Sequence, residues 1–468
     1  MSSELVSKLP SVVHALSERF EEAGFDLAIV GGPVRDLLLG RSSPDLDFTT
    51  NATPDQMMPL LSQWADNLWE IGRDFGTIAI EKDGYQLEIT TYRADNYDKN
   101  SRKPEVQFGT KLEDDLFRRD FTVNALALRL PSGELVDVTG GQKDLENKIL
   151  RTPIEAEISF SDDPLRMLRA ARFVSQLEFH LEEKTARAMS EMTDRLAIIS
   201  RERIRDELIK LMCGTNPVSG IECLRETKLL KVVLPEVDAL QLDIDPKHHH
   251  KDIYAHTLTV VQQAIDLETG PQGPCPRPDF ILRFAALMHD IGKPDTRKFE
   301  ANGAVSFYHH DIIGAKLTRK RMRELRFDKV TIKKVSRLVE LHLRFFGYAE
   351  GAWSDAAVRR YVTDAGDVLE YLHRITRADV TTKNKKKAKR LKSAYDDLEN
   401  RIVQLKEKEE LDSVRPDLNG HEIMETLSLK PGPQLGKAYN FLLEERMEHG
   451  PLEKDVAITK LKEWWAQQ

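Results

Sequence analysis

The sequence predicts an α+β fold in which a small mixed sheet is followed by a long helical region. Short apolar runs with β-branched residues, bounded by glycines and charged residues, occur before residue 91 and predict strands. From 160 to 240, and again after 388, apolar residues recur at helical spacing. At 468 residues the chain can hold about three domains, since a domain typically has ~100–200 residues. We expect these segments: a mixed-sheet head at 1–150, a helical neck at 151–245, a helical domain at 246–385 and a helical tail at 386–468.

The composition is that of a soluble protein. Hydrophobic residues make up 40% of the chain and charged residues 31%, and no apolar run is long enough to span a membrane. The N-terminal sequence MSSELVSKLPSVV lacks the basic start and apolar core of a secretory signal. Three cysteines without metal-like spacing fit a reducing compartment. We therefore expect a cytoplasmic monomer or homodimer without a membrane partner.

The net charge of −8 argues against a uniform coat of nucleic acid, but two stretches are locally basic. One is a helical pattern at 316–337, and the other is the run KNKKKAKRLK at 383–392. Either stretch can be a solvated helix face or a contact for an RNA backbone. In the second run, Lys385, Lys386 and Lys387 are candidate RNA contacts.

The apolar pattern predicts the elements of the head. In chain order we expect a helix at 5–24, a strand at 27–30, a helical turn at 34–39, a strand that contains Asp45 and Asp47, a helix at 57–69, a hairpin with strands at 76–80 and 85–90, a loop at 95–103, and a charged segment from 114 that leads into an apolar helix.

Two glycines and two aspartates in the stretch AIVGGPVRDLLLGRSSPDLDFTT, residues 28–50, predict a site for metal and phosphate. Alternate residues of a strand point to one face, so Asp45 and Asp47 can share a hard cation such as Mg²⁺. Gly31 and Gly32 lack a Cβ atom, which lets a triphosphate approach the backbone and its N–H groups. A glycine turn before an acidic strand end is the alternative interpretation.

The whole stretch resembles the signature of class II tRNA nucleotidyltransferases and their bacterial poly(A) polymerase relatives. The residues at matching places are Gly31, Gly32, Arg35, Asp36, Gly40, Asp45 and Asp47. The resemblance implies that Glu88, within EITTYR, is a third catalytic carboxylate; a charged residue on an exposed strand face is the alternative. The segment RRDFTVNA resembles a second motif of this family, which implies that Arg119, Asp120 and Asn124 hold the triphosphate and the ribose.

The neck contains two charged residues that can read a base. Asp163 and Arg166 are three residues apart and therefore neighbours on a helix, where a simple ion pair is the alternative. Their segment resembles the family's EDxxR motif with Asp162 in place of Glu, which implies nucleotide binding by Asp163, Arg166 and Arg169. A carboxylate that accepts from an amino group and a guanidinium that donates to a ring nitrogen satisfy both cytosine and adenine.

The helix that contains these residues has a start signal. Ser161 or Asp162 can cap its N-terminus, with Pro164 in the opening turn. A following helix resembles the next motif of the family and is implied to support the first one, through Glu202, Arg203 and Glu207.

A second group of potential metal ligands lies beyond residue 251. An adjacent His-Asp pair with an earlier His and a later Asp resembles the HD superfamily of metal-dependent phosphohydrolases. The implied ligands are His256, His289, Asp290, His310, His342 and Asp379. Such a set suits Mn, Fe, Ni, Co or Zn better than Mg²⁺ and can activate water near neutral pH. His309 competes with His310, which the spacing favours, and the triple histidine at 248–250 is interpreted as a linker.

Together the resemblances imply a polymerase β-like nucleotidyltransferase head, an all-helical neck, an HD domain and a helical tail. The implied enzyme adds CCA to the 3′ end of tRNA from CTP and ATP with Mg²⁺. Its HD domain is expected to hydrolyse 2′,3′-cyclic phosphates or phosphate monoesters with a transition metal. Three alternatives remain open: an A-adding enzyme or poly(A) polymerase on the same scaffold, an HD phosphohydrolase whose N-terminal half only binds RNA, and a regulatory RNA-binding protein.

Overall fold

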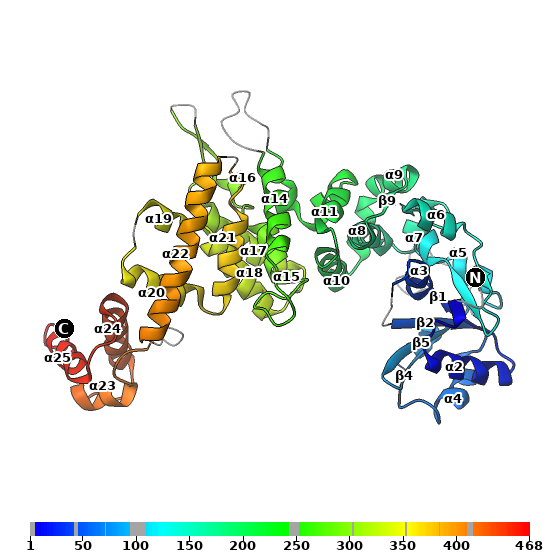
Figure 1. Cartoon of the computed structure of the whole chain (residues 1–468), viewed down its shortest axis with the longest axis horizontal. Helices are drawn as coiled ribbons and strands as arrows, with labels where there is room; N and C mark the ends of the chain where they lie inside the picture. The colour runs from blue at the N-terminus through cyan, green and yellow to red at the C-terminus, as the bar shows by residue number, and fades with distance from the viewer. Residues whose placement is uncertain are drawn as a thin grey trace. The chain divides into compact units, whose positions relative to one another are not determined.

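The structure of the protein is a computed structural model, shown in Figure 1. It describes residues 5–41, 45–70, 72–93, 109–242, 252–301, 304–351, 353–382, 384–409 and 415–468. The chain divides into two compact units, Met1–Val233 and Leu234–Gln468. The first contains the large sheet and the neck helices, and the second is mainly helical. The predicted α+β class is confirmed.

A seven-stranded mixed sheet forms the head, with the strand order β3-β4-β5-β2-β1-β6-β7. The strands are β1 Leu27–Val30, β2 Asp45–Thr50, β3 Asn67–Trp69, β4 Thr77–Lys82, β5 Tyr85–Thr91, β6 Ala127–Leu130 and β7 Leu135–Val136. Strands β2 and β5 pair in parallel, and the other pairs in this sheet are antiparallel. The predicted first two strands and the β4–β5 hairpin are confirmed.

Both faces of the sheet are covered, because successive side chains of a strand alternate. Leu27 and Ile29 of β1 join a core with α2 Ser11–Glu22, α3 Gly32–Leu38 and α4 Pro54–Leu61. Ala28 and Val30 join a second cluster with α5, Leu112–Phe117. Helices α2 and α4 lie beside β4 in Figure 1. Strand β1 is therefore held from both sides where it leads into the two glycines.

The prediction of a helix at 57–69 is wrong in its second half. Helix α4 spans Pro54–Leu61 and starts at a capping box formed by Thr53 and Gln56. Residues Asn67–Trp69 form β3 and pair with β4. A short apolar run is compatible with helix or strand, and pairing with the sheet decides this one.

The predicted apolar helix after the charged segment is also wrong. Helix α5 leads through the 3-10 turn η2, Thr122–Asn124, into strand β6. Strand β6 pairs with β1 along its length, so sheet pairing again overrides the local pattern. The loop predicted at 95–103 lies outside the described residues.

The neck is helical, as predicted for 160–240. Its elements are α6 Gly141–Asn147, β8 Ile149–Leu150, α7 Ala156–Asp162, α8 Leu165–Leu177, β9 His180–Leu181, α9 Glu183–Glu191, η3 Thr193–Ile198, α10 Arg201–Met212, α11 Pro217–Glu226 and α12 Leu230–Val233. Helix α8 packs against α10 and α11. A buried ion pair of 3.0 Å joins Arg172 of α8 to Glu207 of α10, so the second helix supports the first.

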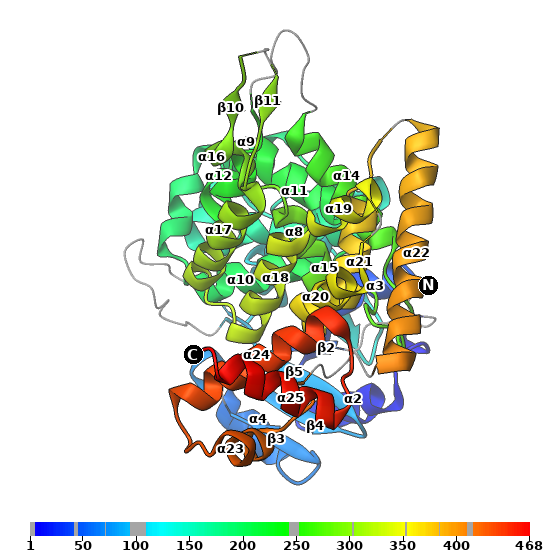
Figure 2. The ribbon, with the colours of Figure 1, turned by 90° about the vertical axis from the view of Figure 1, so that its left-hand side faces the viewer.

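The second unit contains the remaining elements. They are α13 Pro235–Asp238, α14 Ile253–Asp266, α15 Phe280–Met288, α16 Lys293–Thr296, β10 Lys298–Phe299, β11 Val305–Ser306, α17 His310–Glu324, α18 Lys329–Leu341, α19 Arg344–Glu350, α20 Asp355–Ala365, η4 Gly366–Val368, α21 Leu369–Ala378, α22 Lys385–Glu409, α23 Gly420–Leu427, α24 Pro433–His449 and α25 Lys454–Trp465. Strands β10 and β11 form a ribbon that projects from these helices (Figure 2).

The tail combines one long helix with a small separate core. Helix α22 packs against α19, α20 and α21, so it crosses the predicted boundary between residues 385 and 386. Helices α23, α24 and α25 bury their own cluster, which includes Ile423, Leu442 and Leu461. Among the described helices, none is both long and apolar enough to cross a membrane.

Candidate active sites

A cleft of about 450 Å³ lies between the sheet of the head and the first neck helices. Asp47 of β2 and Glu88 of β5 are direct partners in the parallel pair, and both line this cleft. Asp45 also belongs to β2, with its backbone opposite Gln86, and its side chain lies outside the described part of the chain. Asp163 and Arg166 line the same cleft. The structure therefore brings the predicted base-reading pair, Asp163 and Arg166, into one cleft with two of the three predicted catalytic carboxylates.

Gly31 makes room for a cationic side chain. It has a φ of 75°, and a Cβ atom there would lie 2.8 Å from Nη1 of Arg119. Its N–H group donates to the carbonyl of Leu126 at 3.2 Å. The N–H group of Gly31 is therefore already engaged by the backbone, and the binding of a triphosphate at Gly31 and Gly32 stays a prediction. A Cβ atom at Gly32 would make only an ordinary contact of 3.6 Å with Arg35.

Several arginine side chains line the cleft. Arg93, Arg118, Arg119 and Arg166 all line it. Burial, followed by the charges of Arg93 and Arg166, lowers the pKa of Arg118 to about 10. Like charges held this close are stabilised by an anion, so the cleft suits a phosphate ligand. Sequence reasoning does not single out Arg93 or Arg118, although the end of EITTYR and the double arginine of RRDFTVNA are signals for them.

Asp120 and Asn124 form the centre of a buried network. Asp120 accepts from Nε and Nη2 of Arg169 at 2.8 and 2.5 Å and from Asn124 at 3.0 Å. Asn124 accepts from Arg35 at 2.7 Å, and Arg35 pairs with Asp36 at 2.8 Å. Burial alone would raise the pKa of Asp120, but the charge of Arg169 and the hydrogen bonds from Asn124 and Arg169 together hold this pKa far below its ordinary value. Asp120 and Asn124 are therefore already hydrogen-bonded to other side chains of the protein. Contact of these two residues with a ribose stays a prediction, and it would require some of these hydrogen bonds to be replaced.

Asp163 is held by backbone and side chain. Its Oδ1 accepts from the N–H group of Leu165 at 3.1 Å, and its Oδ2 pairs with Arg203 of α10 at 3.3 Å. The prediction that Ser161 or Asp162 caps α8 is wrong, because both residues belong to α7 and Asp163 accepts instead.

Arg166 is fixed by the neighbouring chain segments. It donates to Oγ of Ser159 at 2.8 Å and to the carbonyl of Arg118 at 2.5 Å. Between the described side chains of Arg166 and Asp163 there is no ion pair, so the alternative of a simple helix ion pair is not met. Each side chain is held separately, and both line the cleft.

The six predicted HD ligands come together in the second unit. They form two groups: His256, His289 and Asp379, and Asp290, His310 and His342. Within each group the ligand atoms lie within 4.8 Å of one another. Helix ends position most of these side chains, at the C-termini of α15, α18 and α21 and at the first residue of α17.

Asp290, a member of the second group, also contacts the histidines of the first. Its Oδ2 is 3.2 Å from Nε2 of His289 and 3.6 Å from Nε2 of His256, whereas its Oδ1 is 3.3 Å from Nε2 of His310. Burial alone would raise the pKa of Asp290, but the charges of His289 and Lys293 lower it well below its ordinary value. The carboxylate is therefore ionised between three imidazoles.

The histidines have nitrogens that fit a metal. Nδ1 of His289, His310 and His342 donates to a backbone carbonyl at 2.8, 2.8 and 2.7 Å. Each Nε2 is buried and makes no well-aligned hydrogen bond to a described residue, and those of His289 and His310 face the Asp290 carboxylate at 3.2 and 3.3 Å. Burial and the charge of His289 lower the pKa of His342 to about 4, which favours the neutral imidazole that binds metals. His309 is exposed and outside both groups, in agreement with the preference for His310. The residues present fit a metal centre.

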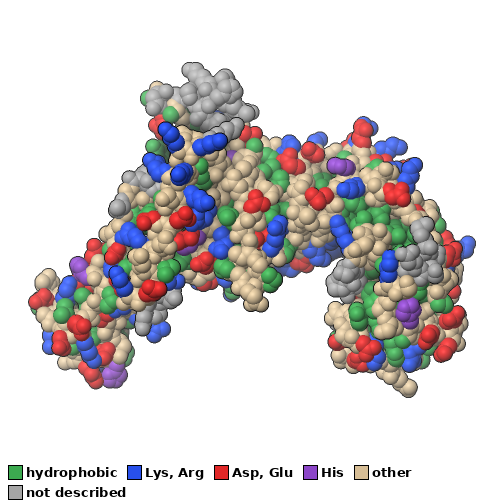
Figure 3. All heavy atoms as spheres, in the orientation of Figure 1, with side chains coloured by type: hydrophobic (Ala, Val, Ile, Leu, Met, Phe, Trp, Pro, Cys, Tyr) green, Lys and Arg blue, Asp and Glu red, His purple; other side chains and the backbone are tan. Residues whose placement is uncertain are grey.

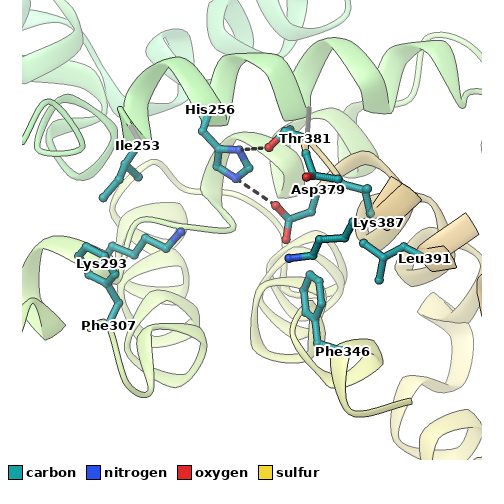
Figure 4. A pocket seen from close by; sticks show the side chains of 11 residues that line it. Ile253, His256, Lys293, Phe307, Phe346, Asp379, Thr381, Lys387 and Leu391 are labelled. Carbon is teal, nitrogen blue, oxygen red and sulfur yellow. Dashed lines mark hydrogen bonds and ion pairs between the residues drawn. The ribbon is translucent and has the colours of Figure 1, made fainter. Parts of the chain in front are cut away.

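A cavity of about 310 Å³ opens beside these ligands (Figure 4). His256 bonds Thr381 through Nδ1 at 3.0 Å and Asp379 through Nε2 at 3.0 Å. Lys293 and Lys387 reach toward the cavity from different elements, α16 and α22. Sequence reasoning does not predict this place for Lys387.

The described cations of the basic run, Lys387 included, are exposed. Lys385 and Lys386 are exposed, and Figure 3 shows Lys and Arg side chains gathered over the N-terminal end of α22. Lys383 and the triple histidine at 248–250 lie outside the described residues. RNA contact by the run stays a prediction.

Three protein families match successive segments of the chain, in the order of the predicted head, neck and HD domain. The poly A polymerase head domain matches residues 27–151, the probable RNA and SrmB-binding site of polymerase A matches 178–241, and the HD domain matches 253–405.

The chain is similar to relatives with two related names. An A-adding tRNA nucleotidyltransferase of Deinococcus radiodurans is 33% identical over 426 residues, which cover 90% of this chain and 91% of that protein. A CCA-adding enzyme of Lactobacillus helveticus is 42% identical over 228 residues, which cover 48% of this chain and only 56% of that protein. The match to the second relative therefore spans about half of each chain.

Solved structures share the fold over nearly the whole chain. A Bacillus stearothermophilus CCA-adding enzyme in complex with CTP has a TM-score of 0.69 at 24% identity, covering 98% of both chains. A Thermotoga maritima CCA-adding enzyme complexed with tRNA has a TM-score of 0.62 at 17% identity. The near full-length relative and the ordered family matches agree with the motifs of the head and the HD ligands. This chain belongs to the family of tRNA nucleotidyltransferases and bacterial poly(A) polymerases and is a nucleotidyltransferase with an HD domain.

Proposed function

We propose that the head completes the CCA end of tRNA without a nucleic-acid template, using CTP and ATP. The observation that supports this most is the shared cleft, which is lined by the carboxylates of the sheet and by Asp163 and Arg166 of the neck. The proposed sites for the triphosphate and for its base therefore lie next to each other in one cleft. The relatives named CCA-adding and A-adding enzymes support tRNA as the acceptor.

In the proposed reaction, the 3′-hydroxyl oxygen of the RNA bonds to the α-phosphorus while the bond to the β-phosphate oxygen breaks. Pyrophosphate leaves with that electron pair. Asp47 and Glu88, with Asp45 from the same strand, would hold Mg²⁺, which when bound activates the hydroxyl and neutralises the triphosphate. Arg118 and Arg119 line the cleft and balance the charge of the phosphates.

Asp163 and Arg166 select the base in this proposal. Cytosine and adenine each present an amino donor beside a ring-nitrogen acceptor, which matches a carboxylate and a guanidinium. Uracil and guanine present a carbonyl oxygen and an N–H group at these places. An acceptor would then face the carboxylate, and a donor would face the guanidinium. Each buried polar group left unsatisfied costs roughly 1–3 kcal/mol, which is sufficient to exclude the wrong bases. Arg203 and Ser159 hold the two side chains for this task.

An enzyme that adds only the terminal A is the alternative, and the Deinococcus radiodurans relative favours it. The test supplies one labelled nucleoside triphosphate at a time to tRNA that lacks its last three nucleotides and to tRNA that ends in CC. We expect CTP incorporation on the first RNA and ATP incorporation on the second. Use of ATP alone would identify an A-adding enzyme, and incorporation of neither nucleotide would contradict the proposal.

We also propose a phosphohydrolase activity for the HD domain. It is supported by the two ligand groups and by the buried Nε2 atoms that make no well-aligned hydrogen bond to a described residue. These residues would hold a transition metal, which when bound supplies an activated water. Lys293 and Lys387 are placed to bind the phosphate of a substrate. Absence of hydrolysis of 2′,3′-cyclic nucleotides and phosphate monoesters with Ni²⁺, Mn²⁺ and Co²⁺ would contradict this activity.

A further inference from the structure

A basic groove lies on the second unit, and none of the HD ligands belongs to its lining. It has a volume of about 690 Å³, compared with about 450 Å³ for the cleft of the head. Its floor includes Phe327, Ile332 and Ser336, all buried. Its walls belong to α17 and α18, which contain the locally basic stretch 316–337. Six of its lining side chains are cationic: Arg319, Arg323, Arg326, Lys329, Lys333 and Arg337.

The charges of this groove are poorly balanced. Glu340 is the one carboxylate among its described lining residues, and it pairs with Arg319 at 3.4 Å and with Arg337 at 3.3 Å. Lys329 and Lys333 are exposed and have no ion-pair partner among the described residues. The chain as a whole has a net charge of −8, so this concentration of cations opposes the overall balance.

The spacing of the cations fits a long anion better than a single phosphate. Lys329, Lys333 and Arg337 follow one another at intervals of four residues, so they lie on one face of α18. With a rise of 1.5 Å per residue, this row extends for about 12 Å. Like charges at such spacing destabilise a helix when nothing compensates them. Glu340 and Asp364 already pair with Arg337. A polyanion would therefore compensate mainly Lys329 and Lys333.

We propose that this groove, the α17–α18 groove, binds the phosphodiester backbone of the tRNA substrate. The inference rests on the proposed function for the choice of RNA. It adds a contact surface on the HD domain, built from Lys329, Lys333 and Arg323. Ammonium and guanidinium groups bind phosphate oxygens and release counterions, so the contact strengthens as the salt concentration falls.

The test compares two double variants of the full chain. Lys329→Ala with Lys333→Ala removes two cations from the groove, whereas Lys316→Ala with Lys320→Ala removes two exposed cations of α17 that do not line it. Binding of tRNA is measured without nucleotides at several salt concentrations. We expect the groove variant to bind roughly 10–30-fold more weakly and its log–log salt slope to fall by about 1.4–1.8, since each phosphate contact contributes about 0.7–0.9. The α17 control should change much less.

A further variant and an activity measurement separate the possible failures. Arg323→Ala, an exposed change on the other wall, should weaken tRNA binding in the same direction. Equal affinities and slopes for the parent and the groove variant would overturn the groove proposal, and so would equal losses in the groove variant and the control. If the unaltered protein adds no nucleotide to tRNA, the proposed function is contradicted instead. The two failures can be told apart because tRNA binding is measured without catalysis.

Discussion

Asp47 and Glu88 occupy partner positions on parallel strands, and this pairing places two carboxylates at one edge of the cleft. Replacing Asp47 by Asn removes a negative charge without a change of shape. We expect nucleotide addition to be abolished and the melting temperature to stay within about two degrees, because the side chain is only partly buried. Asp74→Asn, an exposed change in the same unit, is the control. Retained addition by Asp47→Asn would place the magnesium site elsewhere.

Substitution of Asp163 tests base selection and leaves Asp47 and Glu88 unchanged. Asp163→Ala removes the acceptor for the amino group of cytosine and adenine, so discrimination against UTP and GTP should fall by roughly tenfold or more. Single-nucleotide incorporation with each of the four triphosphates measures this. Glu157→Ala, exposed on the preceding helix, serves as the control. Wild-type discrimination by Asp163→Ala would show that the base is read elsewhere.

At the scale of single residues, sequence patterns identify the type of each side chain better than its partners. Strand alternation places Asp45 and Asp47 on one face, but the placement of Asp47 beside Glu88 depends on the parallel pairing of β2 with β5, and only the family resemblance pointed to Glu88. The ion pair between Asp163 and Arg203, or the bond from Arg166 to the carbonyl of Arg118, joins residues far apart in the chain. No local pattern specifies such contacts, because they depend on how α7, α8 and α10 pack.

At the scale of elements, α8 and α10 are joined by the buried pair of Arg172 and Glu207, both less than 9% exposed. Glu207→Ala leaves the guanidinium buried without its partner, which should lower the free energy of unfolding by roughly 3–5 kcal/mol. Urea denaturation followed by circular dichroism measures the loss. Glu202→Ala, exposed on the same helix, should change it by less than about 0.5 kcal/mol. If the double change Arg172→Met with Glu207→Leu is no more stable than Glu207→Ala, the pair is not the cause.

Helix α22 contributes Lys387 and Leu391 to the lining of the HD cavity, whereas Lys385 and Lys386 do not line it. Lys387→Ala should therefore raise the KM of phosphate-ester hydrolysis roughly tenfold, as expected for loss of a charged phosphate contact. Lys386→Ala is the matched control and should leave the KM unchanged. Equal KM values for the two variants would remove Lys387 from the substrate site.

The elements themselves were predictable where local signals agree with packing. The β4–β5 hairpin has alternating apolar residues and an Asp-Gly turn, and both signals favour the observed structure. Strands β3 and β6 were not predictable, because their sequences are compatible with helix and only pairing with β4 and β1 decides. Helix α22 was expected to be helical after residue 388, but its packing on α19, α20 and α21, which crosses the predicted domain boundary, depends on distant contacts.

At the scale of the whole molecule, the two candidate sites belong to different compact units. His289 is a predicted ligand of the HD site and lies in the second unit, whereas the carboxylates of the cleft lie in the first. His289→Ala should therefore abolish metal-dependent hydrolysis and leave nucleotide addition unchanged. Parallel assays of both activities on one preparation check this. A matching loss of nucleotide addition would show that the units depend on each other.

The central claim is that one cleft in the head builds a defined trinucleotide without a nucleic-acid template. The most direct measurement offers all four nucleoside triphosphates together to tRNA that lacks its CCA end and then sequences the products. We expect products that end in CCA. They should contain no added U or G, because in the proposed function only cytosine and adenine satisfy Asp163 and Arg166. A run of adenosines, a single added A, or the incorporation of U or G would contradict the claim.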